Sequence, residues 1–150
     1  MSLKKPYPSK NGPLDSLEEL LLVKGVDREI LYGKEGREGV INYLTVHSDG
    51  RVNINTASLP VLISLSPKVD QAMAQAVLTY RKEKPFLKTE DLRSIPGWDP
   101  VYPQISSEIT VRTNYFSMEV VGNYREARAV VQTVVRRDGR ATKVLFWKAG

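Results

Sequence analysis

The sequence predicts an α+β protein in which the helices come first and the strands last. Residues 14–103 predict a helical domain of the helix-hairpin-helix or SAM-like kind, because apolar residues recur there at helical spacing between capping residues and prolines. Residues 104–150 predict an antiparallel β-meander, because β-branched and aromatic residues dominate there and alternate with polar ones. Residues 1–13 hold three prolines and three lysines and predict an extended arm, in which Met1-Ser2-Leu3 has the composition of an added leader.

The composition is that of an ordinary globular protein, and 150 residues suffice for one domain or a compact pair. A net charge of +5 is compatible with phosphate contacts but does not establish them. Without cysteine the chain has neither a disulfide framework nor a thiolate zinc site. No apolar run approaches the roughly 20 residues that cross a bilayer, and no signal-peptide pattern is present.

The first helical hairpin is predicted between residues 14 and 33. Asp15 and Glu18 fit a capping box at the start of its first helix. Asp27 is predicted to cap the second helix, which ends at Gly33. Three residues lie on one face of the first helix: Leu17, Leu20 and Leu21.

Two loops are predicted between the hairpin and the central helices. Residues 33–39 contain three glycines in seven residues and predict a mobile loop. Residues 43–46 and 51–55 are short β-type runs around Ser48-Asp49-Gly50, which predicts a hairpin turn.

The central helices are predicted from their caps and their apolar spacing. Thr56 is predicted to cap a helix, and Ser66-Pro67 to open the next one, with proline at its first position. That helix shows the clearest periodicity in the chain, over residues 69–80, and ends at Pro85. Thr89 is predicted to cap a last short helix. The side chains predicted to point inward around these caps include Leu59, Leu62, Ile63, Leu92 and Ile95.

The last third changes from helical spacing to alternation. Residues 109–121, 127–136 and 142–148 are rich in Val, Thr, Tyr and Phe. Asp138-Gly139 is a strong tight-turn signal. Together they predict a three-stranded meander.

Catalytic groups are scarce. His47 is the only histidine, lies beside a predicted turn and has no serine in a nucleophile-elbow context near it. The acidic pairs Glu18-Glu19 and Glu90-Asp91 fall in first turns of helices, where the helix dipole favours acids. Phosphate-cradling P-loops and dinucleotide fingerprints are absent. We therefore expect no enzymatic activity and name no catalytic, cofactor-binding or metal-binding residue.

Two basic clusters have a functional and a structural interpretation. Residues 136–140 (RRDGR) form a candidate phosphate patch, but a hairpin tip of solvated charges is the commoner explanation of such a cluster. Tyr80-Arg81-Lys82 is more typical of a helix end, where cations are favoured by the dipole.

A helix-hairpin-helix that binds DNA places a Gly-hydrophobic-Gly turn at a helix start, so that bare amides meet a phosphate. The equivalent turn at residues 65–70 contains Pro67, which has no N–H, and Asp70, which repels a phosphate. The turns at residues 24–27 and 96–99 each keep one glycine but follow it with an acid. All three turns predict poor DNA binding.

Several motifs in order resemble the periplasmic part of the type II secretion minor pseudopilin K family, the general secretion pathway protein K family. They are LDSLEEL at residues 14–20, VKGV at 23–26, YLTV at 43–46, GRVNINTA at 50–57, PF at 85–86, LRSIPG at 92–97, YF at 115–116 and VLFW at 144–147. The resemblance covers nearly everything from residue 14. Its Asn-Thr-Ala segment alone is shared with competence-type DNA receptors, whereas the order of all the motifs is specific.

The resemblance implies a pilin-like protein in which residues 14–103 are a helical insertion and residues 104–150 are the main sheet of the pilin head. Members of this family are anchored in the bacterial inner membrane by an N-terminal apolar helix and face the periplasm. They cap the pseudopilus tip together with the minor pseudopilins I and J. The anchor, the prepilin cleavage site and the long helix behind the sheet are missing here, which we interpret as truncation that leaves an apolar sheet face uncovered. We expect no cofactor: calcium enters by family analogy only, because some related proteins bind it, and no loop here has convincing oxygen-ligand spacing.

The leading hypothesis is therefore a non-enzymatic component of a type II secretion pseudopilus that acts through protein–protein contacts. The alternative is a helix-hairpin-helix module that binds nucleic acid. A hydrolase or transferase would require a polar pocket around His47. The sequence identifies no individual partner-contact residues.

Overall fold

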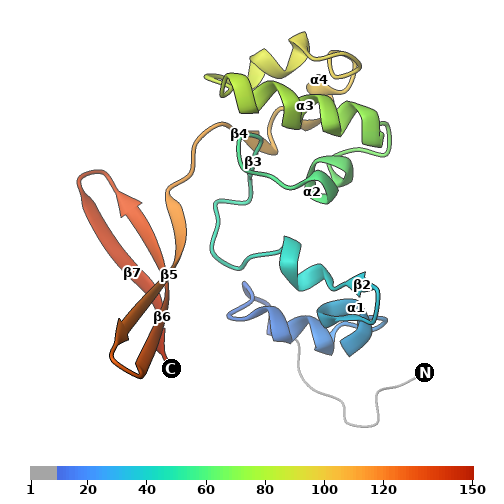
Figure 1. Cartoon of the computed structure of the whole chain (residues 1–150). Helices are drawn as coiled ribbons and strands as arrows, with labels where there is room; N and C mark the ends of the chain where they lie inside the picture. Colours follow the sequence, from blue (N-terminus) through green and yellow to red (C-terminus); the bar gives the residue numbers. More distant parts are fainter. Residues whose placement is uncertain (1–9) are drawn as a thin grey trace. The chain divides into compact units, whose positions relative to one another are not determined.

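The computed structural model describes residues 10–150, so the expected leader and most of the predicted arm lie outside the described residues. The chain divides into two compact units, one that ends at Val46 and one that begins at His47 (Figure 1). Helices come first and an antiparallel meander comes last, which confirms the α+β class. The predicted boundary between residues 103 and 104 stays a prediction.

The first unit opens with a 3₁₀-helix, η1 (Leu17–Leu22). Its capping acid is Glu19, whose carboxylate accepts hydrogen bonds from the backbone N–H groups of Asp15 at 2.8 Å and Ser16 at 3.3 Å. The predicted box of Asp15 with Glu18 is wrong by one residue. The reason is that Ser16, in extended backbone conformation, is the N-cap, so that Glu19 occupies the third helical position.

The second helix of this unit is α1 (Arg28–Tyr32). Asp27 caps it as predicted, since its carboxylate accepts from the N–H of Ile30 at 2.8 Å. The last helix of the unit is a second 3₁₀-helix, η2 (Val40–Tyr43). The β-type run predicted at residues 43–46 forms no strand, because Tyr43 ends η2 and residues 44–46 are irregular.

The glycine-rich segment after α1 is ordered, contrary to the predicted mobile loop. It forms two short antiparallel strands, β1 (Gly33–Lys34) and β2 (Arg37–Glu38). A side chain on Gly33 or Gly39 would overlap backbone atoms across this ribbon, and Gly33 also has a φ of 90°. Here glycine permits close backbone approach rather than mobility.

The second unit begins with β3 (Val52–Asn53), which does not form the predicted hairpin around Ser48-Asp49-Gly50. It pairs in parallel with β4 (Ile109–Thr110), at the far end of the helical segment. The N–H of Val52 donates to the carbonyl of Glu108 at 2.8 Å, and the N–H of Ile54 to that of Thr110 at 3.0 Å. Thus this two-residue ladder joins the two ends of the helical segment.

Four helices lie between these strands: α2 (Leu59–Ser64), α3 (Gln71–Glu83), η3 (Thr89–Ser94) and α4 (Tyr102–Ile105). The predicted cap residues are displaced in three of them. Ser58, not Thr56, precedes α2. Asp70 caps α3 by accepting from the N–H of Met73 at 2.8 Å.

The start of η3 also differs from the prediction that Thr89 caps it. Lys88 is the N-cap, and the Asp91 carboxylate accepts from the N–H groups of Leu87 and Lys88, each at 3.1 Å. In each of these helices several polar residues compete for the same free amides, and spacing alone does not rank them.

The inward-facing side chains were predicted correctly. Leu62 and Leu92 are fully buried, Ile95 is buried, and Leu59 and Ile63 pack against the same core. Trp98 lies at its centre and donates its indole N–H to the carbonyl of Met73 at 2.9 Å. The buried members of the cluster all fall between residues 54 and 109: Ile54, Leu62, Val69, Ala74, Val77, Phe86, Leu92, Ile95, Trp98, Val101, Ile105 and Ile109.

The predicted meander is confirmed, as β5 (Tyr115–Tyr124), β6 (Ala127–Asp138) and β7 (Ala141–Ala149) in the order β5-β6-β7. Its first strand starts at Tyr115 rather than residue 109, because residues 109–110 belong to β4. Gly139, with a φ of 59°, follows Asp138 in the turn between β6 and β7. A bulge between Val134 and Val135 shifts the register of β6 against β7.

Candidate interaction surface

The two faces of the meander differ sharply in charge. Directly paired residues of an antiparallel sheet share a face, so the register assigns every side chain to one side. Of the charged residues in the three strands, one face carries Arg137 alone. The opposite face carries the remaining six: Glu119, Arg128, Arg136, Asp138, Lys143 and Lys148.

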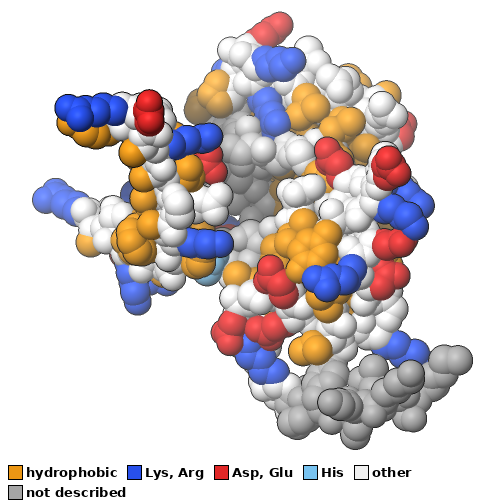
Figure 2. All heavy atoms as spheres, turned by 60° about the horizontal axis from the view of Figure 1, so that its bottom comes forward, with side chains coloured by type: hydrophobic (Ala, Val, Ile, Leu, Met, Phe, Trp, Pro, Cys, Tyr) orange, Lys and Arg blue, Asp and Glu red, His pale blue; other side chains and the backbone are white. Residues whose placement is uncertain are grey.

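We call the first of these the apolar sheet face. Its central members come from all three strands: Phe116, Met118, Val120, Val131, Thr133, Val135, Val144 and Trp147. In Figure 2 hydrophobic side chains run along the meander, at the left of the view, with Lys and Arg side chains beside them.

Large side chains of the apolar sheet face are exposed to solvent. Trp147 exposes 64% of its surface and Val120 57%, whereas Val135, on the central strand, is buried between its neighbours. The single polar central member, Thr133, is satisfied, because its hydroxyl donates to the carbonyl of Phe146 at 2.8 Å. An exposed, contiguous apolar face rimmed by charge is typical of a surface that binds another protein element.

Arg137 closes one end of this face. Its guanidinium carbon lies 5.6 Å from the centre of the Phe116 ring, and the same group donates to the carbonyl of Thr113 at 3.3 Å. Its charge is therefore held at the rim and not over the centre of the face.

The residues considered as catalytic candidates form no common site. Two of the acids stabilise helix starts, and the histidine lies in a separate segment. His47 is half-buried in an irregular segment ahead of β3. Glu19 and Asp91 accept backbone N–H groups at helix starts. The Asp15 N–H and the Lys10 ammonium lower the pKa of the Glu19 carboxyl.

The basic clusters also resolve into local interactions. In the 136–140 cluster, Arg136 pairs with Asp138 at 2.7 Å, and this contact raises the pKa of Arg136. Arg81 does not simply end α3: its guanidinium donates to the carbonyls of Ile54 at 2.9 Å and Ala57 at 2.7 Å. Burial lowers the pKa of Arg81.

The acids of the three turns examined for DNA binding are all engaged. Asp27 and Asp70 accept the amides at the starts of α1 and α3, which are the groups that a phosphate would need. Asp99 forms an ion pair with Arg93 at 2.6 Å. These turns are built to start helices rather than to hold a phosphate.

Asn55 has a structural role that the sequence did not predict, since Asn55 stood out there only as part of the GRVNINTA motif. Its side-chain amide bonds to the backbone of Phe86 in both directions and donates to the carbonyl of Val111 at 3.2 Å. The NINT segment gave the signal, since asparagine after a short β-type run is a residue that satisfies nearby backbone groups.

Within residues 10–150 no three histidine or acidic side chains come together as metal ligands would. Among the same residues, no helix has the length and apolar character needed to cross a membrane.

Comparison with protein families identifies a match within the second unit. Residues 52–112 match the family model of the type II secretion system (T2SS), protein K. This segment coincides with the part of the second unit that runs from β3 to just past β4. Neither the curated proteins nor the solved structures yield a match.

Proposed function

We propose that this chain, as a member of the type II secretion system protein K family and a component of that system, is a minor pseudopilin. We propose that its place is the tip of the pseudopilus. It would act by protein–protein contact on the periplasmic face of the inner membrane, next to the minor pseudopilins I and J. No catalytic step is part of this role.

The observation that carries the proposal is the apolar sheet face directly after the protein K segment. A meander with one apolar and one charged face is half of a packed structure, since an apolar face of this kind must be buried to be stable. A long apolar helix of the pilin kind is the element that we propose covers it.

The exposed aromatic and aliphatic side chains supply the driving force for this packing. Fully burying a side chain such as Val120 or Phe116 contributes about 1.5–3 kcal/mol relative to leaving it exposed. Trp147 and Met118 add a ring and a flexible thioether, which adapt well to a helix surface.

Two neighbouring valines provide a matched test. Val120 lies on the apolar sheet face and Val121 on the charged face of the same strand, and they are 57% and 40% exposed. Val120→Lys would place an ammonium in the buried contact, whereas Val121→Lys would add a charge to an already charged surface.

The experiment introduces each change into the full-length protein in its own bacterium and measures export of a type II substrate and crosslinking to the I and J pseudopilins. We expect Val120→Lys to reduce export by about tenfold, since a few kcal/mol of contact energy are lost, and Val121→Lys to retain it. Equal export by both variants would remove the apolar sheet face from the proposal. Normal export after deletion of the gene would overturn the role itself.

A further inference from the structure

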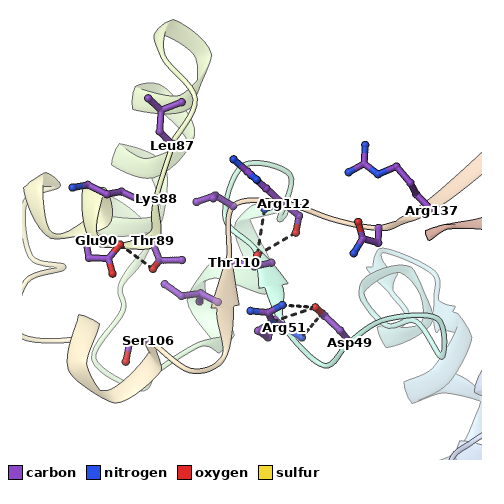
Figure 3. A pocket seen from close by; sticks show the side chains of 13 residues that line it. Asp49, Arg51, Leu87, Lys88, Thr89, Glu90, Ser106, Thr110, Arg112 and Arg137 are labelled. Carbon is purple, nitrogen blue, oxygen red and sulfur yellow. Dashed lines mark hydrogen bonds and ion pairs between the residues drawn. The ribbon is translucent and has the colours of Figure 1, made fainter. Parts of the chain in front are cut away.

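A cavity of about 610 Å³ lies in the second unit, away from the apolar residues at the centre of the sheet face. Figure 3 shows the side chains around it, which come from the segment before β3, the residues at and just before the start of η3, the end of α4, the segment from β4 to β5 and strand β6. Its volume is within the range of ligand sites, about 300–1,000 Å³.

The charges around this cavity do not balance. Four cations line it, Arg51, Lys88, Arg112 and Arg137, against two carboxylates, those of Asp49 and Glu90, which leaves an excess of two positive charges. An excess of one sign in a concave site attracts ligands of the opposite sign.

The four cations differ in whether they already form ion pairs or hydrogen bonds within the chain. Arg51 is neutralised by Asp49, with Nη2 and Oδ2 2.7 Å apart, and Arg137 donates to a backbone carbonyl. Lys88 and Arg112 form no ion pair with any described residue, and both side chains are exposed. They are the two groups free to bind an incoming carboxylate.

The rest of the lining suits a peptide. The hydroxyl of Ser106 donates to the carbonyl of Pro103 at 3.4 Å, so its oxygen can accept a peptide N–H group. The hydroxyl of Thr110 donates to the carbonyl of Arg112 at 3.2 Å and accepts the Arg112 N–H at 3.3 Å, which leaves one lone pair for a ligand. Leu87, 71% exposed at the rim, offers an apolar contact.

We propose that this cavity binds an acidic segment of a partner protein, in which carboxylates engage Lys88 and Arg112 and an apolar side chain rests on Leu87. Arg137 borders both this cavity and the end of the apolar sheet face, but the other residues that line the cavity lie outside that face. A peptide fits better than a nucleic acid, because a nucleic acid carries a negative charge on every nucleotide and must bring some of these charges near the Glu90 carboxylate. A peptide can place its carboxylates at Lys88 and Arg112 and neutral N–H groups at Glu90.

The test is an NMR titration of the ¹⁵N-labelled 150-residue chain with an acetylated, amidated hexapeptide, Gly-Asp-Leu-Glu-Asp-Gly. The uncharged counterpart Gly-Asn-Leu-Gln-Asn-Gly, inorganic phosphate and a hexanucleotide are titrated in parallel. We expect saturable shifts with the acidic peptide, centred on the amides of residues 87–90 and 109–114.

Two double variants with equal charge change separate a site from general attraction. Lys88→Gln with Arg112→Gln removes the free cations of the cavity, and Arg140→Gln with Lys143→Gln removes two exposed cations outside its lining. We expect the first pair to weaken peptide binding about tenfold or more and the second to leave it within about twofold.

Equal weakening by the two pairs, equal binding of the uncharged peptide, or no saturable binding at all would overturn the proposal. Tighter binding of the hexanucleotide or of phosphate than of the peptide would overturn it as well. Because these measurements do not involve secretion, their failure would leave the role in the pseudopilus untouched.

Discussion

The side-chain amide of Asn55 pairs with the backbone of Phe86 as a neighbouring strand would, donating to its carbonyl at 2.9 Å and accepting from its N–H at 2.8 Å. A third bond, to the carbonyl of Val111 at 3.2 Å, ties in the segment after β4. One half-buried side chain therefore joins three segments that are far apart in the sequence.

Replacing Asn55 should be costly for this reason. Asn55→Asp keeps the shape but turns two donated bonds into contacts between a carboxylate and carbonyl oxygens, and we expect a loss of about 1–3 kcal/mol at pH 7. The loss should shrink at acidic pH, where the protonated carboxyl can donate again. Chemical denaturation of both proteins at pH 7 and pH 4 measures this difference, and a loss independent of pH would contradict it.

Arg81 and Lys82 form a natural comparison at the end of α3. Arg81→Met removes two bonds to the carbonyls of Ile54 and Ala57 and should lower the free energy of unfolding by about 1–3 kcal/mol. Lys82→Met, on an exposed side chain, should change it by less than about 0.5 kcal/mol. Equal effects in urea denaturation would show that the Arg81 contacts add no stability.

The first unit should respond to acid through Glu19. Its carboxyl has a folded pKa below the usual value, so its stabilising effect is complete above the unfolded pKa and is lost as pH falls through the folded one. The protection of the Asp15 and Ser16 amides against exchange, corrected for the intrinsic exchange rate at each pH, should therefore fall as the pH drops below the usual range of a glutamate carboxyl. In Glu19→Gln this pH dependence should disappear, and its persistence would assign the effect to another group.

Residues 50–113 should fold in isolation, because they contain the whole core cluster and both strands of the closing ladder. The fragment should unfold cooperatively on heating in circular dichroism, with emission from a buried Trp98, its only tryptophan. Emission at the wavelength of exposed tryptophan without a thermal transition would show that the core needs the rest of the chain.

The nucleic-acid alternative makes the opposite prediction from ours in a binding assay. Because the acids of the three turns hold helix amides or an arginine, we expect no micromolar affinity for duplex or single-stranded DNA at about 150 mM salt. Fluorescence anisotropy across a salt series tests this. Micromolar binding that weakens steeply with salt would restore the DNA-binding hypothesis.

The sequence predicted the interior of the helical segment well, because burial in a helix follows from the spacing of apolar residues. The spacing of Leu62, Leu92 and Ile95 can be recognised without knowing which residues they contact. Helix starts were less predictable. Ser16, Thr56 and Thr89 stand among other polar residues that compete for the same amides, and 3₁₀ and α turns accept the same caps.

Contacts between residues far apart in the chain could not be predicted from the sequence. The β3–β4 ladder is only two residues long on each side, too short for a period, and its strands lie at opposite ends of the helical segment. The bonds of Asn55 span 31 and 56 residues for the same reason. The candidate cavity depends likewise on side chains such as Lys88 and Arg112, which only the folded chain brings together.

The β3–β4 ladder has a further meaning for how such a protein can be put together. Val52 and Ile109 are neighbours across two paired strands, so the chain enters and leaves the helical segment at nearly the same point. A segment whose two ends lie close together can be inserted into a loop of another domain without moving the ends of that loop apart. The helices between them could be exchanged, lengthened or lost in evolution while the flanking framework kept its own path.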